Sequence, residues 1–154
     1  MHDVYLGLGA NLGDREKQLS NALEQLAAHD CIEVVGISPF IETQAESPYP
    51  QPNYINGVVH IHTILTPEEL LTETQAIEQR AGKRKKGSGD PRYLDIDLLL
   101  YDDQVFSSDE LIIPHPLMHE RLFVLEPLRQ LAPDFRHPVL GESISALYDR
   151  MIGY

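Results

Sequence analysis

The chain has 154 residues, which suits a single domain over 1–154, and its 42% hydrophobic and 23% charged residues are ordinary for a globular protein. Acidic residues outnumber basic ones by 24 to 12, and the net charge of −12 argues against nucleic acid as the partner, because nucleic acids are themselves dense lines of negative charge. Cys31 is the only cysteine, no apolar run could span a membrane and no signal-peptide pattern starts the chain, so we expect no disulfide, no membrane contact and a cytoplasmic location.

The first part of the sequence predicts strands and one helix in alternation. Apolar and β-branched runs predict strands over residues 4–8, 32–37 and 54–65. Between the first two strands, residues 9–13 predict a tight turn and Asp14 predicts an N-cap, followed by leucines at helical spacing. Residues 42–53 are polar and contain three prolines, so they predict a loop.

The middle of the chain predicts a second helix, a basic loop and a further strand. Thr66-Pro67-Glu68-Glu69 combines a capping box with proline at the first helical position, and Gly82 marks the end of the helix. A loop with Gly87, Ser88 and Gly89 follows, and it leads into an apolar strand that begins near Asp95.

The last part predicts a hairpin around Asp102 and Asp103 and then two helices, the second of which starts at Ser143. The first of these helices is expected to turn four leucines inward: Leu122, Leu125, Leu128 and Leu131. The core order strand-helix-strand-strand-helix-strand is that of a ferredoxin-like α+β fold with a mostly antiparallel sheet. With the C-terminal helices on the second face, we expect a three-layer α/β/α sandwich.

Asp95 and Asp97 are the most informative pair in the sequence. Because side chains alternate between the faces of a strand, the two carboxylates point the same way while Ile96 points the other way. Neighbouring carboxylates repel unless a cation lies between them, and all-oxygen pairs suit Mg²⁺ together with substrate phosphates. The simpler interpretation is that the two acids face solvent on an edge strand.

A basic cluster precedes this pair and contains half of the positive charge of the chain: Arg80, Lys83, Arg84, Lys85, Lys86 and Arg92. Basic groups beside a metal-binding carboxylate pair suit a small polyphosphate, whose oxygens they would hold while the metal ions bridge them. A solvated charge run is the alternative.

Other motifs are weaker. The glycines of 7–13 resemble a dinucleotide fingerprint, but the third glycine comes one residue late, so we expect a tight strand-to-helix turn. His60 and His62 share a strand face and could form half of a zinc site, yet no cysteine or third histidine has a matching spacing, which favours polar surface positions. Pro114 and Pro116 fix His115 in a rigid turn that favours its presentation to a ligand.

The segment Asp90-Pro91-Arg92-Tyr93-Leu94-Asp95-Ile96-Asp97-Leu98-Leu99 resembles the signature of the 6-hydroxymethyl-7,8-dihydropterin pyrophosphokinase family. Further segments match along nearly the whole chain: residues 9–13, 52–56, 66–71, 113–128 and 131–133, with Gln75 and Glu78 on the second helix. Each segment alone is weak, but their order and spacing together are specific.

The resemblance implies a ferredoxin-like α/β/α sandwich that transfers pyrophosphate from ATP to a pterin hydroxymethyl group in folate biosynthesis and leaves AMP. It implies two Mg²⁺ ions held by Asp95 and Asp97, with Arg92 as a third catalytic residue. We also expect a monomer without nucleic-acid or membrane partners. The implied contacts to ATP are Leu71, Gln75, Glu78, Lys83, Lys85, Arg92, His115 and Arg121. The implied contacts to the pterin are Thr43, Tyr54, Asn56 and Phe123.

The chain departs from the family pattern in the basic loop. Lys83 and Lys85 stand where arginine is usual, and lysine cannot clamp a phosphate bidentately. Gly89-Asp90 replaces an aromatic residue and a small one, and the loop is one residue shorter, so weaker loop closure is expected. Simpler interpretations also stay open: Gln75 and Glu78 as an exposed helix pair, and Phe123 as a core residue.

Two other classes of function fit the same residues. A palm-type nucleotidyltransferase or cyclase also places paired acids on a ferredoxin-like sheet and uses two metal ions, but it releases pyrophosphate from ATP. A non-catalytic ferredoxin-like ligand-binding relative would share the fold, although it would have little reason to gather basic residues beside Asp95 and Asp97.

Overall fold

The computed structural model describes residues 1–44, 52–82 and 93–153. Lys83, Lys85 and Arg92, which the sequence assigns to the phosphate side of the site, lie outside these residues, as does most of the predicted basic loop. Within the described residues, no helix has both the length and the apolar composition needed to cross a membrane.

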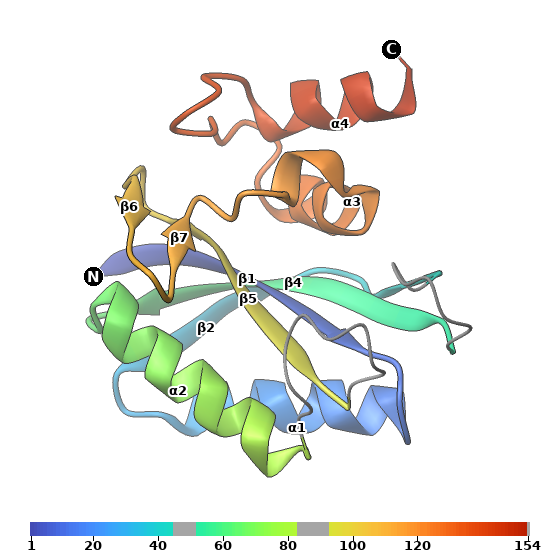
Figure 1. Ribbon diagram of the computed structural model, residues 1–154, viewed down its shortest axis with the longest axis vertical. Helices are drawn as coiled ribbons and strands as arrows, with labels where there is room; N and C mark the ends of the chain where they lie inside the picture. The colour runs from blue at the N-terminus through green and yellow to red at the C-terminus, as the bar shows by residue number, and fades with distance from the viewer. Residues whose placement is uncertain (45–51, 83–92, 154) are drawn as a thin grey trace.

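A five-stranded sheet forms the centre of the molecule (Figure 1). Its strands are β1 (His2–Ala10), β2 (Ile32–Ile37), β3 (Ile41–Thr43), β4 (Tyr54–Thr63) and β5 (Asp95–Tyr101). The strand order is β2-β4-β1-β5, with β3 beside β4, and each of these pairings is antiparallel. The central strand β1 therefore lies between β4 and the edge strand β5.

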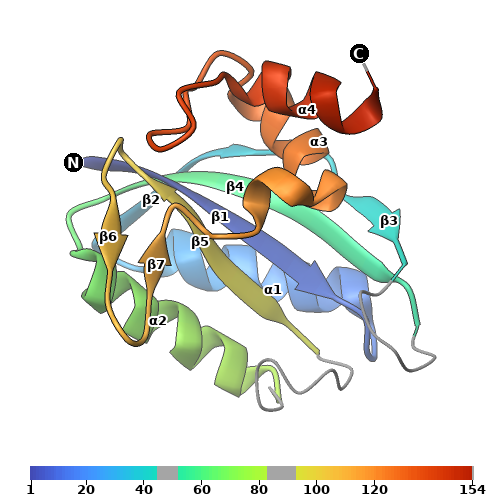
Figure 2. The same ribbon diagram turned by 45° about the horizontal axis from the view of Figure 1, so that its top comes forward.

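Helices cover both faces of the sheet, as Figures 1 and 2 show. One face carries α1 (Arg15–Ala28) and α2 (Pro67–Arg80), and the other carries α3 (Leu122–Leu131) and α4 (Ile144–Ile152). A small second sheet of β6 (Phe106–Ser107) and β7 (Ile112–Ile113) and the 3₁₀ helix η1 (Met118–Glu120) connect β5 to α3. The predicted α+β class with a mainly antiparallel sheet is confirmed.

Three helices begin at the predicted residues because side chains satisfy their first backbone N–H groups. Asp14 accepts a hydrogen bond from the Lys17 N–H at 3.1 Å, and Ser143 accepts one from Ala146 at 3.1 Å. The Thr66 hydroxyl accepts from the Glu69 N–H while the Glu69 carboxylate accepts from the Thr66 N–H, which is the complete capping box.

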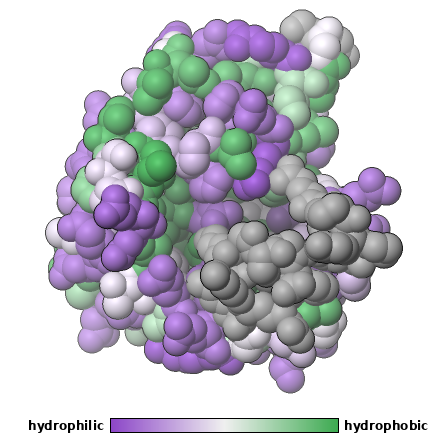
Figure 3. All heavy atoms as spheres, in the orientation of Figure 1, coloured by the Kyte–Doolittle hydropathy of each residue, from purple (hydrophilic) through white to green (hydrophobic). Residues whose placement is uncertain are grey.

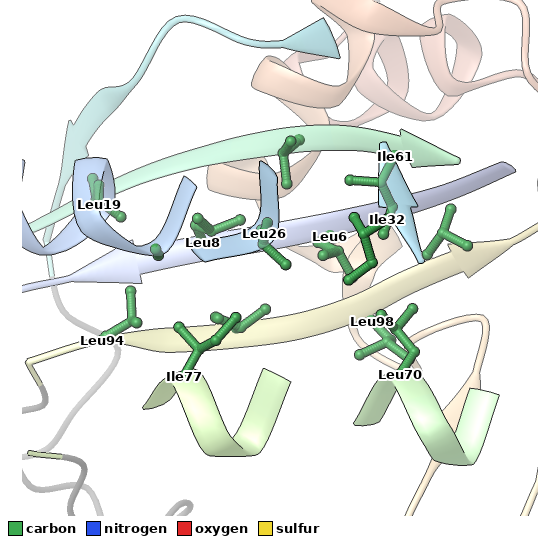
Figure 4. Close-up of a cluster of buried hydrophobic side chains, with 14 of the residues drawn as sticks. Leu6, Leu8, Leu19, Leu26, Ile32, Ile61, Leu70, Ile77, Leu94 and Leu98 are labelled. Atoms are coloured by element: carbon green, nitrogen blue, oxygen red, sulfur yellow. The ribbon is translucent and has the colours of Figure 1, made fainter. Parts of the chain in front are cut away.

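Strand alternation divides the apolar residues between two cores. Between the sheet and the pair α1 and α2, buried side chains from four elements meet: Ile96 and, as labelled in Figure 4, Leu6, Leu8, Leu19, Leu26, Leu70, Ile77 and Leu98. Truncating any of these to alanine is expected to cost about 2–5 kcal/mol of folding free energy. This core fixes α2 alongside β5.

The second core lies under α3 and α4 and includes Tyr5, Val58, Met118, Leu125 and Leu128. A bulge assists it: Tyr5 pairs with Leu100 and Leu6 pairs with Leu98, so Leu99 is an extra residue in β5, and both Leu99 and Leu100 join this core. The bulge begins two residues after Asp97, so the pairing of both acidic residues with β1 stays regular.

Four local predictions were wrong. β1 extends to Ala10, so Gly9 lies in the strand and not in the turn, and β3 occupies part of the predicted loop 42–53. The predicted hairpin around Asp102 and Asp103 is not formed, because the strand that follows, β6, pairs with β7 and not with β5. Leu122 is 39% exposed, because the inward positions in the first turn of α3 are those of Val124 and Leu125.

Candidate active site

The pairing of β5 with β1 determines what surrounds the two acidic residues. Asp95 lies opposite Gly9 and Asp97 lies opposite Gly7, so both carboxylates project from the sheet beside positions that have no side chain. Both acidic residues are partly buried. Gly7 and Gly9 therefore let neighbouring side chains approach β1 closely, since a Cβ on Gly7 would lie 3.4 Å from the Leu99 side chain and one on Gly9 would lie 2.6 Å from Asn56 Oδ1. The turn interpretation of these glycines missed this role.

Asn56 continues the row of Asp95 and Gly9 across the sheet, because it pairs with Gly9 from the other side. A Cβ atom on Gly9 would lie 2.6 Å from Asn56 Oδ1 and 3.4 Å from a ring carbon of Tyr54. The amide of Asn56 thus lies across the backbone of Gly9. Only glycine leaves room for this arrangement, since real Cβ contacts below 3.0 Å are essentially absent.

The side chains predicted to meet a pterin gather beside this row. Thr43 pairs with Tyr54 at the β3–β4 edge, and Asn56 Nδ2 donates to the Thr43 hydroxyl at 2.8 Å. Asn56 is buried, whereas Thr43 and Tyr54 are partly exposed. Because the Asn56 Nδ2 bonds within the site, its orientation is fixed relative to the sheet.

Glu78 corrects the idea of an exposed helix pair. Its side chain is 1% exposed and accepts a hydrogen bond from the Ile96 N–H at 2.8 Å. Ile96 lies between the two acidic residues on the edge strand β5. Its N–H points away from β1, and the Glu78 carboxylate accepts its hydrogen bond. The carboxylate of α2 thereby holds the segment that carries Asp95 and Asp97. On the same helix, Gln75 is exposed and Leu71 packs partly buried against the first core.

His115 lies next to the same strand. Its N–H donates to the carbonyl oxygen of Leu99 at 3.0 Å, and its Nδ1 accepts from the Leu117 N–H at 3.2 Å. Because Nδ1 acts as the acceptor, the neutral ring carries its proton on Nε2 and can donate from that atom. The turn that the prolines predicted is thus anchored on β5 two residues beyond Asp97.

Arg121 and Phe123 stand at the start of α3. The guanidinium carbon of Arg121 lies 5.4 Å from the centre of the Phe123 ring, within the range of a cation–π interaction. Phe123 is partly buried and packs against the second core, to which Val58 belongs, and Val58 pairs with Gly7 in the row of Asp97. The Phe123 side chain therefore packs against the second core and is also partly accessible from outside.

A shallow apolar recess of about 210 Å³ adjoins His115 on its other side. Its lining includes Ile112, Val139 and Leu140 from β7 and the segment before α4, all of which are at least 41% exposed. Figure 3 shows hydrophobic residues gathered over this side of an otherwise mostly hydrophilic face.

Sequence reasoning missed the residues that hold the edges of the site. The Asn11 amide donates to the Pro52 carbonyl oxygen at 3.2 Å, and Arg15 donates to the Asn53 carbonyl oxygen at 2.8 Å, so both secure the chain where it enters β4. Asn11 lies in one of the matched segments, which was the available signal, whereas nothing in the sequence marked Arg15.

Tyr93, immediately before β5, packs between two glycines from distant elements. A Cβ on Gly13 would lie 3.3 Å from its ring and one on Gly82 would lie 3.1 Å from it, and both glycines have positive φ, of 67° and 83°. The ring therefore contacts the β1–α1 turn and the end of α2 at once, which holds Tyr93 two residues ahead of Asp95.

The donor set of the site suits a hard cation. Asp95 and Asp97 supply carboxylate oxygens from adjacent positions on one strand face, opposite Gly9 and Gly7 of β1. No described nitrogen or sulfur ligand joins them in a metal-binding group of the kind that softer ions prefer. The residues present could therefore hold Mg²⁺.

Comparison with known proteins gives one consistent result. Residues 5–133 match the family model described as 7,8-dihydro-6-hydroxymethylpterin-pyrophosphokinase (HPPK). A 2-amino-4-hydroxy-6-hydroxymethyldihydropteridine pyrophosphokinase of Synechocystis sp. is 41% identical over 150 residues, which cover 97% of this chain and 76% of the relative. One from Bacillus subtilis is 40% identical over 128 residues, covering 83% of this chain and 77% of the relative.

Longer proteins contain a similar unit. The folic acid synthesis protein fol1 of Schizosaccharomyces pombe is 40% identical over 148 residues, but the match spans only 20% of its length. Among solved structures, that of Plasmodium falciparum HPPK-DHPS with pteroate aligns over 97% of this chain and 42% of that one, with a TM-score of 0.77 and 16% sequence identity. At that identity the likeness shows the fold alone.

Proposed function

Since the chain belongs to the family of 7,8-dihydro-6-hydroxymethylpterin-pyrophosphokinases, we propose that it transfers pyrophosphate from ATP to 6-hydroxymethyl-7,8-dihydropterin in folate biosynthesis, giving AMP and the pterin diphosphate. In this reaction a bond forms between the hydroxymethyl oxygen and the β-phosphorus of ATP, while the bond from that phosphorus to the oxygen retained by AMP breaks. One observation carries the proposal: Asp95, Gly9 and Asn56 form a single row across β5, β1 and β4, with a carboxylate at one end and a recognition amide at the other.

The carboxylate end of the row is the proposed metal site, where Asp95 and Asp97 would hold two Mg²⁺ ions. When bound, such ions neutralise phosphate charge and lower the pKa of the attacking hydroxyl. Glu78 acts here as a positioning residue, because it holds the Ile96 N–H between the two ligands. Arg92 would neutralise the charge that develops on the departing AMP phosphate.

The amide end of the row is the proposed pterin site. Asn56 would hydrogen-bond the amide-like edge of the pterin, and the contact with Thr43 limits the rotation of its side chain. Tyr54 and Phe123 would stack on the two faces of the flat ring system, as aromatic side chains do with planar ligands. Such a site would hold the hydroxymethyl group toward Asp95, which places the acceptor near the phosphate chain.

ATP would lie along β5, between α2 and the start of α3. His115 can donate from Nε2 to a phosphate oxygen, since its Nδ1 is occupied by the Leu117 N–H. Arg121 would hold a second phosphate, and the loop residues Lys83 and Lys85 would add positive charge. Leu71 and Gln75 on α2 would border the nucleotide.

We also propose a ferredoxin-like, three-layer fold and a monomeric assembly. Leaving out the short β3, the core elements run strand-helix-strand-strand-helix-strand, which supports the ferredoxin-like class, and the helices on both faces support a three-layer sandwich. We propose that the chain is one domain and acts as a monomer. Light scattering during gel filtration would test the monomer directly.

The deciding experiment incubates the protein with Mg²⁺, ATP and hydroxymethyldihydropterin and follows all the nucleotide products. We expect AMP and pterin diphosphate in equal amounts. Release of pyrophosphate would favour the palm-type nucleotidyltransferase or cyclase, and formation of ADP would contradict the proposal. Binding of the substrates without turnover would indicate the non-catalytic relative.

A separate variant tests the proposed role of Arg92. Arg92→Ala should lower kcat while leaving the affinity for the pterin nearly unchanged, because its charge would act on the leaving group. Weakened pterin binding at an unchanged kcat would contradict that role, and Arg92→Lys separates charge from bidentate geometry.

A further inference from the structure

A second polar cluster lies on the same sheet face as Asp95 but toward the opposite ends of β1 and β4. Asp3 pairs with His62, and His60 is two residues away on the same face of β4. The Nε2 atom of His60 lies 2.8 Å from Asp3 Oδ1, and that of His62 lies 2.7 Å from the same oxygen. One ligand atom from each of the three residues lies within 4.8 Å of the others.

The geometry is close to that of a metal site. Ligand atoms about 2.0–2.1 Å from a tetrahedral zinc ion lie roughly 3.3 Å apart, so the two imidazoles would have to move outward by only about half an ångström. Side-chain exposures of 52% for Asp3, 23% for His60 and 35% for His62 leave the cluster open to an ion and to a water ligand from solvent.

Neighbouring side chains hold both rings in the required orientation. His62 Nδ1 lies 3.5 Å from the Glu33 carboxylate on β2, and a carboxylate behind a ligating histidine is the usual outer support of such a site. The ring of His60 stacks on Tyr5 with centroids 4.4 Å apart and planes 13° apart. Tyr5 is in turn fixed by the ring of Phe135, at 5.8 Å.

We propose that Asp3, His60 and His62 bind one divalent transition-metal ion, with Zn²⁺ as the fitting species. Two imidazoles and one carboxylate favour such ions over Mg²⁺, which prefers oxygen ligands. Metal binding requires the Nε2 lone pairs, so the ring protons move to Nδ1, where the proton of His62 meets Glu33. The ion would join β1 to β4, and β2 through Glu33, independently of the proposed transferase activity.

The third ligand explains why spacing along the chain favoured polar surface positions over a zinc site. His60 and His62 lacked a third histidine or a cysteine at a suitable spacing along the chain. Asp3 lies 57 residues before His60 and reaches the cluster only through the pairing of β1 with β4. The alternative is a network of hydrogen bonds without any metal.

The test uses a background variant with Asp95→Asn and Asp97→Asn, so that the proposed catalytic carboxylates cannot contribute ligands. Titration of this variant with Zn²⁺ by calorimetry, and with Co²⁺ by visible absorption, should give one ion per chain. Adding His62→Ala should weaken binding at least about 100-fold, and Glu33→Gln should weaken it by about tenfold. His29→Ala is the matched control, because it removes a partly exposed histidine at the end of α1. It should bind Zn²⁺ with the affinity of the background variant.

Failure to bind Zn²⁺ in the background variant, or equal affinity with and without His62→Ala, would overturn the proposal. Circular dichroism in EDTA establishes that each variant is folded, and His62→Gln replaces His62→Ala if the latter is not. In the otherwise wild-type protein, His62→Ala should form AMP with Mg²⁺ at the wild-type rate, and loss of that activity would count against an independent site.

Discussion

The two ends of one sheet face carry polar clusters that differ in what lies opposite them. Asp95 and Asp97 face glycines on β1, whereas His60 faces Tyr5 on the same strand. The glycines let the Asn56 amide and the Leu99 side chain lie close over β1, so this end combines all-oxygen donors with a buried amide. Tyr5 instead stacks on His60, with ring centroids 4.4 Å apart, and so fixes an imidazole at the other end. The residues of β1 therefore determine which side chains can lie over the sheet at each end.

The largest expected effect concerns the acidic pair, which should be essential for the transferase activity. Asp95→Asn or Asp97→Asn should lower the rate of AMP formation by about 10³-fold, because charge stabilisation at the phosphates is lost. The measurement is single-turnover formation of AMP, with circular dichroism to establish folding. The paired control, His60→Ala, changes the other cluster and should leave the rate unchanged, and near-normal turnover of either asparagine variant would remove the metal assignment.

The close approach of the Asn56 amide to β1 can be tested with two neighbouring glycines. Gly9→Ala would put a Cβ 2.6 Å from Asn56 Oδ1, so the amide must move, and we expect the KM for the pterin to rise by about tenfold or more.

Gly7→Ala is the matched control, because its Cβ would meet Leu99 side-chain atoms at 3.4 Å, close to an ordinary contact. Steady-state kinetics with each substrate varied separates the two variants. Equal effects on the pterin and on ATP would contradict the placement of Asn56 at the pterin.

Glu78, which holds the strand segment between the two acidic residues, is expected to affect the stability of the fold as well as the rate. Glu78→Ala leaves the Ile96 N–H without its acceptor, so the free energy of unfolding should fall by about 1–3 kcal/mol. Urea unfolding measures this loss, and kcat should fall with it.

Glu78→Gln retains an oxygen that can accept the hydrogen bond and should recover most of both properties. If the alanine variant lost only ATP affinity, at full stability, Glu78 would be a ligand contact and not a positioning residue.

The smallest expected effect concerns pH at the histidine end. The hydrogen bond from His60 holds the pKa of Asp3 below its ordinary value of 3.8, with further lowering by His62. A lowered carboxyl pKa contributes stability above the unfolded pKa, and this stability is lost as the pH falls through the folded pKa. The difference in unfolding free energy between wild type and Asp3→Asn should therefore be present at pH 7 and shrink below about pH 4. A difference that stays constant to pH 2 would show that the carboxylate charge contributes nothing.

The sequence correctly predicted the features that depend only on residues close together in the chain. The Thr66 capping box gave the start of α2, and period-two alternation put Asp95 and Asp97 on one face. The failures involve long-range pairing: β3 has only three residues, two of which fall in the predicted loop 42–53, and its pairing with β4 makes it a strand. The burial of Glu78 likewise depends on Ile96, which lies 18 residues further along the chain.

The contact of Tyr93 with Gly82 has a consequence for how the chain can vary. These two residues flank the segment 83–92, and their contact brings its ends together irrespective of what joins them. The entropic cost of closing such a segment grows slowly, by about 0.6 kcal/mol for each doubling of its length. Insertions and deletions between Gly82 and Tyr93 should thus be tolerated without shifting the strand that follows.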